Sequence, residues 1–294
     1  MMLKSPKLNI LVAFPYFRQG ILDNLKNRDP STFRLIVDSG AFTAWNTGKQ
    51  IDINDYMRFL KTIPSEWDYK AVQLDVFGDP EGTYTNYHRM LDAGFNDIMP
   101  VFTRGDSLER LEEFYSYTDY IMFGGIVIGG ENTNYVKWFC EVNKGRHAHW
   151  LGFVNVPFIK HYKPYSVDSS TLYSGQRFGR LEYYVGGGQL KGTSRKDFYK
   201  KPSQTVIHYL KKSGFTDGEI GLLANQQAWE GGASPFNGKS MRGLAAFMTV
   251  TNHVKRAVEV ERHLGTKIYL ALGNESQIDN VFDSLALLQS KKLV

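Results

Sequence analysis

Three aspartates in this sequence stand where short apolar runs end, and carboxylates are groups that can do chemistry. The three runs, each ended by its aspartate, are Leu35–Asp38, Val72–Asp75 and Tyr165–Asp168. Because the C-terminal ends of parallel strands meet at one mouth of an α/β barrel, we expect these three carboxylates to converge there. Their placement indicates an enzyme.

Asp38 and Asp168 are the pair on which we base the chemistry. Two carboxylates that flank a sugar C1′ can divide a difficult displacement into two steps, in which one attacks the carbon and the other carries the proton of the departing or arriving base. Such a site needs no metal and no cofactor, and we expect neither. For a single aspartate, a helix cap or a turn such as Asp38-Ser39-Gly40 is the more frequent use. Three of them at strand ends favour the catalytic interpretation.

The elements that would position these residues alternate along the first 170 residues, with short β-rich runs separated by stretches that carry helix signals. The predicted strands are Leu8–Phe14, Phe33–Val37, Lys70–Leu74, Asp97–Phe102, Tyr120–Gly124, His149–Val154 and Tyr165–Val167. Their even spacing, without a Gly-x-Gly-x-x-Gly after the first strand, predicts an α/β fold of the (β/α)8 TIM-like barrel type instead of an open sheet. The pattern does not identify the eighth strand.

Beyond Asp168 the pattern changes. The stretch Arg180–Val185, followed by three glycines, predicts a β-hairpin inserted after the seventh strand. The rest indicates a mostly helical C-terminal part, over Thr205–Lys212, Met241–His263 and Gln277–Gln289, with a further apolar run at Lys267–Leu272. With 294 residues, of which 42% are hydrophobic, the chain is long enough for one large core. We therefore predict a single barrel domain over residues 1–294, with a basic insertion at about 173–212.

Cysteine and histidine usage argues against a metal centre. Cys140 is the only cysteine, so neither a disulfide framework nor a thiolate cluster forms within the chain, and we expect a reducing, cytoplasmic setting, which is the host cytoplasm if a phage encodes the protein. His147, His149 and His161 lack a ligand spacing, which favours surface or supporting roles over a metal site. No apolar run approaches the roughly 18 residues that cross a bilayer, and we expect no signal sequence and no membrane partner.

Positive charge is concentrated in one segment. The whole chain has a formal net charge of +5, whereas residues 158–212 hold eleven Lys or Arg against three acidic residues. Tyrosines and phenylalanines are interleaved with them, a composition typical of proteins that follow a phosphate backbone. A solvated face is the alternative. We expect nucleic acid to contact Arg177, Arg180, Lys191, Arg195, Lys196, Lys200 and Lys201.

Several motifs resemble those of one enzyme family. Residues 37–42 are Val-Asp-Ser-Gly-Ala-Phe, and residues 124–129 are Gly-Gly-Ile-Val-Ile-Gly. These resemble the Asp-Ser-Gly-Gly-Phe/Tyr and Gly-Gly-Leu-Ala-Val-Gly motifs of the tRNA-guanine transglycosylases (queuine tRNA-ribosyltransferases). Three further stretches resemble the family in the same order, namely Leu74–Pro80, Val167–Asp168 and Gly179–Tyr184. The resemblance extends over roughly residues 37–199.

The resemblance implies a role for each matching residue. Asp168 would be the nucleophile on C1′ and Asp38 the general acid/base. Asp75 would hydrogen-bond the purine edge, and Phe42 would stack on the heterocycle. The other base contacts that it implies are Ser39, Gly40, Thr103, Gly125 and Ile126.

The departures from the family pattern change the expected substrate. A single cysteine cannot build the Cys-x-Cys-x-x-Cys…His zinc site of the tRNA enzymes, so we expect no zinc subdomain. The chain is also shorter, and Ala41 and Thr103 stand in place of a glycine and a glutamine. What remains is similar to the zinc-free, phage-type DNA-guanine transglycosylases, which exchange guanine in DNA for a 7-deazaguanine such as preQ0. The resemblance thus implies DNA and a free 7-deazaguanine base as partners, with tRNA as the alternative polymer.

Two other classes of function remain as alternatives. A retaining glycosidase that uses Asp38 and Asp168 would explain the paired acids, but not the basic segment. A nucleic-acid-binding protein without catalysis would explain the basic segment and leave three strand-end aspartates without a role. The sequence does not indicate the oligomeric state.

Overall fold

The computed structural model describes residues 5–17, 19–127, 132–169, 171–173, 180–194, 197, 201–225 and 241–294. Contacts group the chain into two compact units. The first, called the sheet unit here, comprises residues 1–169 and 264–275. The second, called the helical unit, comprises residues 170–263 and 276–294. The single domain expected from the sequence stays a prediction.

One parallel sheet forms the centre of the sheet unit. Its strands are β1 (Leu8–Ala13), β2 (Phe33–Asp38), β3 (Tyr69–Val72), β4 (Ile98–Met99), β5 (Val101–Phe102), β6 (Tyr120–Phe123), β7 (His147–Trp150), β8 (Ser166–Ser169) and β11 (Lys267–Leu272). Their order in space is β4-β3-β2-β1-β11-β8-β7-β6-β5, and every pair runs parallel. The sheet therefore positions all its C-terminal strand ends along one edge.

The two strands at the ends of that order, β4 and β5, are separated in the chain only by Pro100. Proline has no N–H to donate to a ladder, so it interrupts a strand. Before the proline, Met99 O of β4 accepts a hydrogen bond from Gln73 N, which follows β3 (3.0 Å). At the proline itself, Pro100 O accepts from Met122 N of β6 (2.8 Å). The sheet is consequently barrel-like and nearly closed.

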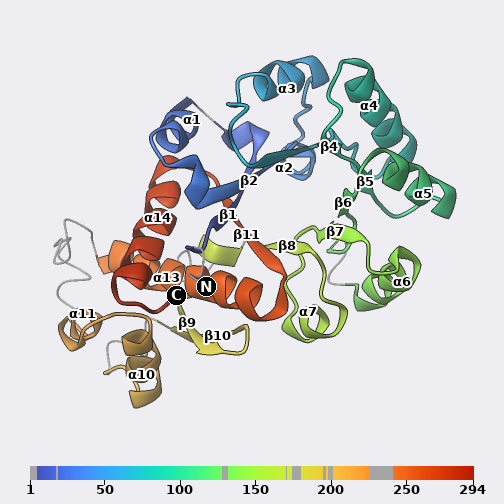
Figure 1. Cartoon of the computed structure of the whole chain (residues 1–294). Coiled ribbons are helices and arrows are strands. Elements are labelled where there is room, and N and C mark those ends of the chain that lie inside the picture. The colour runs from blue at the N-terminus through green and yellow to red at the C-terminus, as the bar shows by residue number, and fades with distance from the viewer. Residues whose placement is uncertain are drawn as a thin grey trace. The chain divides into compact units, whose positions relative to one another are not determined.

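Helices connect these strands and lie around the outside of the sheet (Figure 1). They are α1 (Gln19–Lys26), α2 (Ala41–Asn46), α3 (Ile53–Leu60), α4 (Pro80–Asp92), α5 (Leu108–Tyr117), α6 (Thr133–Asn143) and α7 (Val156–Tyr162), with short 3-10 helices at Phe14–Tyr16 and Pro30–Thr32. Five of them begin at a side chain that accepts a hydrogen bond from the first turn, at Asp52, Asp79, Ser107, Asn132 and Asn155. These caps are local sequence signals that fix where each helix begins.

Apolar side chains fill the interior of the sheet. The cluster is contributed by β1 to β6 and β11, and its buried members are Leu11, Ile36, Val72, Met99, Val101, Tyr120, Met122 and Tyr269. Residues at alternate positions of a strand share a face, so one row of each strand points into this core. The polar residues at the strand ends lie beyond the core, at the C-terminal edge.

The helical unit contains the predicted hairpin. Strand β9 (Arg180–Gly186) pairs antiparallel with β10 (Gln189–Ser194). The helices of this unit are α10 (Gln204–Lys212), α11 (Asp217–Leu222), α13 (Met241–Leu264), α14 (Glu275–Ser290) and a 3-10 helix at Thr171–Tyr173; α13 and α14 each extend into the sheet unit by their end residue. Leu181 and Tyr183 of β9 pack with α10 and α13 in one buried cluster.

The strands predicted in the first 170 residues are all present, with ends shifted by a few residues. Two points differ. The predicted strand Asp97–Phe102 is split by Pro100, and β7 runs over His147–Trp150 instead of the predicted His149–Val154. The apolar run Lys267–Leu272 is β11, which lies between β1 and β8 in the sheet.

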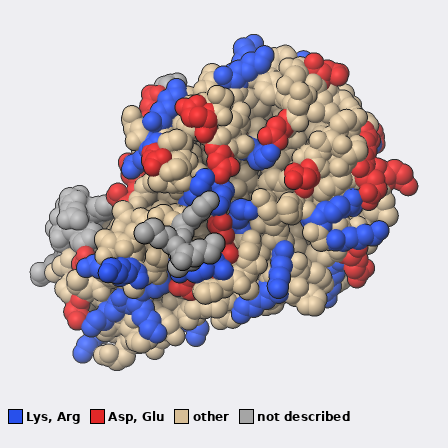
Figure 2. All heavy atoms as spheres, in the orientation of Figure 1, with Lys and Arg blue, Asp and Glu red and all other residues tan. Residues whose placement is uncertain are grey.

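Charge is uneven on the face drawn in Figure 2. Lys and Arg side chains gather over α10 of the helical unit, whereas acidic side chains gather over α5 of the sheet unit. Within the described residues, no helix combines the length and the apolar character that crossing a bilayer requires.

Candidate active site

Asp38, Asp75 and Asp168 lie at the C-terminal edge of the sheet. Asp38 is the last residue of β2, Asp168 is the third of the four residues of β8, and Asp75 follows the end of β3 by three residues. The charges of Asp75 and Asp168 both act on the Asp38 carboxyl group. The structure thus brings the three aspartates into one electrostatic cluster.

Asp38 has the most perturbed carboxyl group of the three. Burial, and then the negative charges of Asp75 and Asp168, raise its pKa to about 7, against the hydrogen bonds that the backbone N–H groups of Gly40 and Ser39 donate to it. The Gly40 bond, to Asp38 Oδ2, measures 3.1 Å. A carboxyl group with a pKa near neutrality can both give and take a proton at physiological pH.

Asp75 is held by the residue that follows Asp38. The buried Ser39 Oγ donates to Asp75 Oδ1 (2.8 Å) and accepts from Ala41 N (3.2 Å). Burial raises the pKa of Asp75, whereas the hydrogen bond from Ser39 lowers it. Ser39 therefore links the turn after β2 to the loop after β3.

Two nitrogen atoms approach one oxygen of Asp168. Gly152 N donates to Asp168 Oδ1 (2.5 Å), and His149 Nε2 lies 3.2 Å from the same atom. His149 is fully buried on β7, and its Nδ1 lies 2.6 Å from Ser166 Oγ. The sequence predicted no specific role for His149. The only hint in the sequence that its side chain shares a strand face with another histidine was its spacing of two residues from His147.

Thr103 follows β5, and the residues of the Gly-Gly motif follow the neighbouring strand β6. Thr103 N donates to Asp106 Oδ2 (2.7 Å), and a Cβ on Gly125 would lie 3.2 Å from Thr103 Oγ1. The Ile126 side chain is fully buried, and its carbonyl oxygen accepts from Asn132 N (3.0 Å). The backbone N–H of Ile126 is therefore the group of this residue that could donate a hydrogen bond to a ligand. Residues 128–131, which include the end of this motif, lie outside the described residues.

Phe42 belongs to an exposed aromatic cluster that sequence reasoning missed. It lies on α2 with 53% of its surface exposed, and its ring centroid is 6.3 Å from that of Trp45 and 5.7 Å from that of Phe77. Trp45 and Phe77 approach to 4.2 Å. Large exposed apolar side chains in a group indicate a contact surface.

Only part of the predicted nucleic-acid contacts is described. Arg180 begins β9 and Lys191 lies on β10, both exposed, and Lys201 is exposed before α10. Arg180 Nε lies 4.0 Å from Glu182 Oε1. The other four, Arg177, Arg195, Lys196 and Lys200, lie outside the described residues.

The histidines are engaged in other contacts. The His147 ring stacks on Tyr165, with centroids 4.1 Å apart, and His161 meets Tyr162 edge-on. Over the described parts of the chain, no three His, Cys, Asp or Glu residues are grouped so as to hold a metal ion.

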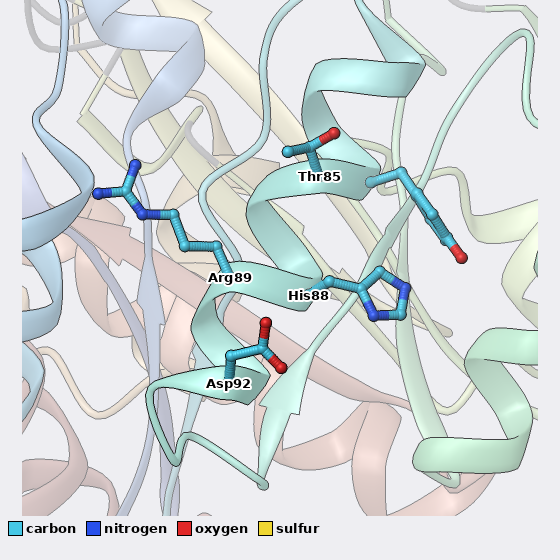
Figure 3. A pocket seen from close by; sticks show the side chains of 5 residues that line it. Thr85, His88, Arg89 and Asp92 are labelled. Carbon is cyan, nitrogen blue, oxygen red and sulfur yellow. The ribbon is translucent and has the colours of Figure 1, made fainter.

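A separate, shallow pocket lies on α4 (Figure 3), lined by Tyr84, Thr85, His88, Arg89 and Asp92. Tyr84 Oη donates to Glu113 of α5 (2.6 Å), and His88 Nε2 lies 3.2 Å from the same Glu113 oxygen. Arg89 donates to Asn54 of α3 (3.0 Å). These side chains connect α4 to α5 and α3, so we assign the pocket a role in packing these helices and no role in the chemistry.

No protein-family model matches this sequence, and no curated protein matches it. The residues of the site are therefore the basis on which a function is proposed.

Proposed function

We propose that the protein is a DNA-guanine transglycosylase that exchanges a guanine of DNA for a 7-deazaguanine base through a covalent intermediate on Asp168. One observation carries the proposal: Asp38, with a pKa near 7, interacts electrostatically with Asp168, one oxygen of which accepts a hydrogen bond from Gly152 N and lies 3.2 Å from His149 Nε2. A proton carrier and a nucleophile with separate environments are what a two-step displacement at C1′ requires.

The proposal includes a (β/α)8 barrel. If β4 and β5 are counted as one strand that Pro100 interrupts, the sheet has eight strands. The eighth strand in chain order, which the sequence pattern did not identify, is then β11. In enzymes of this fold the active site lies at the C-terminal ends of the strands, where the three aspartates are found.

In the first step, a carboxylate oxygen of Asp168 attacks C1′ of a deoxyguanosine. The C1′–N9 bond breaks, its electron pair goes to the guanine, and the protonated Asp38 supplies the proton that the departing base needs. Asp168 is then joined to C1′ by an ester bond, and Asp38 is a carboxylate.

In the second step, the Asp38 carboxylate takes the N9 proton of the incoming 7-deazaguanine. N9 then attacks C1′, the bond between C1′ and Asp168 breaks, and its electron pair returns to the Asp168 carboxylate. Atoms and charges balance, and the site returns to its initial state without a metal or a redox cofactor.

Recognition of the base falls to residues beside the two catalytic carboxylates. Asp75, oriented by Ser39, would accept hydrogen bonds from the N–H donors that guanine and 7-deazaguanines share. Phe42, exposed on α2, would stack on the heterocycle. Thr103 and the Gly125–Ile126 backbone, which follow neighbouring strands, would line the opposite side of the base.

The test is base exchange on two polymers. The protein is incubated with preQ0 and either DNA or tRNA, and the nucleosides are analysed by mass spectrometry. We expect a preQ0 nucleoside in DNA with wild-type protein and with Asp92→Asn, a control on the exposed surface of α4, and none with Asp168→Asn. Exchange only in tRNA would select the alternative polymer, and absence of exchange in both would contradict the proposal.

A further inference from the structure

A chain of buried polar side chains leads from Asp168 into the interior of the sheet unit. His149 Nε2 lies 3.2 Å from Asp168 Oδ1, His149 Nδ1 lies 2.6 Å from Ser166 Oγ, and Ser166 Oγ lies 2.5 Å from Tyr120 Oη. All four residues are buried. The register explains the contact, because His149 of β7 pairs with Ser166 of β8. The mechanism derived above uses only the first member of this chain.

One direction of these hydrogen bonds gives every group in the chain a partner of the right kind. Burial raises the pKa of Tyr120 well above its ordinary value, so its hydroxyl keeps its proton and can donate to Ser166. The hydroxyl of Ser166 then donates to His149 Nδ1, which leaves the imidazole proton on Nε2, directed at Asp168 Oδ1. With a neutral imidazole, the opposite direction would place the lone pairs of Nε2 and Oδ1 3.2 Å apart in a buried site.

We propose that His149 is a positioning residue for Asp168, held in the Nε2–H form by Ser166 and Tyr120. Together with the N–H of Gly152, it engages Asp168 Oδ1 and leaves Oδ2 as the oxygen that attacks C1′. The assignment of the attacking oxygen rests on the proposed function, whereas the assignment of the proton to Nε2 does not.

This arrangement would serve both steps of the exchange. When Oδ2 is esterified, Oδ1 is the carbonyl oxygen of the ester and keeps the same two donors. When the ester bond breaks, negative charge returns to a carboxylate that already has its hydrogen-bond partners in place, and no reorganisation is needed. No proton leaves His149 in either step, so its role is orientation and charge stabilisation.

The first experiment reads the protonation form directly. Nitrogen-15 NMR of histidine-labelled protein, with His149→Gln as the assignment control, distinguishes Nε2–H from Nδ1–H imidazole without any activity measurement. We expect the Nε2–H form in wild type, and in Ser166→Ala a shifted Nδ1 resonance, because that nitrogen loses its hydrogen-bond donor. An Nδ1–H form in wild type, or an Nδ1 resonance unchanged in Ser166→Ala, would overturn the inference whatever the fate of the proposed function.

The second experiment measures formation of the protein–DNA adduct together with the dissociation constant for preQ0. We expect His149→Leu to slow adduct formation about 10²-fold with little change in preQ0 binding, since misplacement of a reacting group costs about that much. His149→Gln, whose side-chain amide can donate toward Asp168, should recover most of the rate. Tyr120→Phe should slow it a few-fold, whereas the matched control Tyr115→Phe, on the outer helix α5, should not.

The outcomes separate the two proposals. If the wild-type protein forms no adduct with DNA or tRNA, the proposed function fails, and the NMR result decides the position of the proton. If wild type forms the adduct and His149→Leu forms it equally fast, the positioning role fails while the function stands. If His149→Leu does not fold, the comparison of His149→Gln with Tyr120→Phe takes its place, and a Gln variant as slow as Asp168→Asn would contradict the positioning role.

Discussion

At the scale of single residues, the site depends on how differently three carboxylates of one type are surrounded. Burial and the negative charges of Asp75 and Asp168 raise the pKa of Asp38 to about 7. Asp75 is oriented by Ser39, and Asp168 by His149 and Gly152. A carboxyl group whose pKa lies near neutrality, such as Asp38, suits proton transfer. A carboxylate with hydrogen-bond donors fixed on one oxygen, such as Asp168, suits attack by the other oxygen.

The raised pKa of Asp38 predicts a pH dependence of stability. Below pH about 4, both the folded and the unfolded chain carry the Asp38 proton. Between about 4 and 7 only the folded chain retains it, so the free energy of unfolding falls as pH rises, and the loss is complete above pH 7. We expect this loss of unfolding free energy to be on the order of a few kcal/mol in wild type and absent in Asp38→Asn. Urea unfolding at pH 5 and at pH 8 measures the difference in each protein.

The control for that measurement is Asp92→Asn, because Asp92 is exposed on α4. It should keep the wild-type difference between the two pH values. A wild-type protein equally stable at pH 5 and pH 8, or an Asp38→Asn variant with the wild-type difference, would show that the Asp38 carboxyl group is not perturbed as described.

Asp75 carries a prediction about specificity. Asp75→Ala should weaken the use of both guanine and preQ0, by roughly 1–3 kcal/mol for each hydrogen bond removed, because buried donors of the base would be left unpaired. The KM of each free base, measured separately in the exchange reaction, tests this effect. Ser39→Ala, which removes the donor to Asp75 and the acceptor of the Ala41 N–H, should raise both KM values by a smaller factor. Wild-type KM values for both bases in Asp75→Ala would remove Asp75 from the base pocket.

At the scale of elements, the turn between β2 and α2 determines where Asp38 and Ser39 point. Gly40 has φ +79°, and a Cβ there would lie 2.3 Å from Pro15 Cδ. A side chain at this position therefore meets both an unfavourable backbone conformation and a steric overlap. The glycine of the Asp-Ser-Gly sequence is required by this close approach.

Gly48 supplies a matched comparison for Gly40, since it has φ +64° and no atom within 4 Å of a built Cβ. Gly48→Ala should cost about 1 kcal/mol of stability through the backbone alone. Gly40→Ala should cost about 1–3 kcal/mol more, because the overlap with Pro15 forces a shift, and it should also displace Asp38. Thermal or urea unfolding of both variants measures the difference. Equal losses would mean that the turn tolerates a side chain.

Local signals explain which elements could be predicted. The strands before residue 170 follow from alternating β-rich runs and capped helix starts such as Asp79-Pro80. The place of β11 could not be predicted, because about a hundred residues separate it from β8 and only the paired register shows that they are neighbours. The aspartates were found because they stand at strand ends, whereas the His149–Ser166–Tyr120 chain depends on the register between strands. Likewise, Trp45 and Phe77 meet only in space.

At the scale of the whole molecule, the charge distribution concerns the polymer. The net charge of +5 conceals a segment, residues 158–212, with eleven basic and three acidic residues. Lys and Arg side chains gather over α10 (Figure 2), whose last turn contains Lys211 and Lys212. A charge concentration of this kind attracts phosphate backbones and makes binding depend on salt.

Replacing Lys191, Arg195, Lys196, Lys200 and Lys201 by alanine should weaken DNA binding across sequences. The slope of the logarithm of affinity against that of salt concentration should fall by about 0.7–0.9 for each phosphate that the variant no longer neutralises. Base exchange at saturating DNA should persist. A matched variant lacks five lysines outside this segment, at Lys26, Lys61, Lys137, Lys144 and Lys291, and should keep the wild-type slope. An unchanged slope in the first variant would place the nucleic acid on another face.

The covalent link between Asp168 and DNA is the central claim, and trapping it is the most direct test. A guanine-containing oligonucleotide is incubated with the protein without an incoming base, the mixture is denatured, and adducts are separated and mapped by peptide mass spectrometry. We expect an adduct in wild type and in Asp92→Asn, attached at Asp168 and released by preQ0, and no adduct in Asp168→Asn. An adduct that persists in Asp168→Asn, or base exchange in that variant at the wild-type rate, would contradict the assignment of Asp168 as the nucleophile.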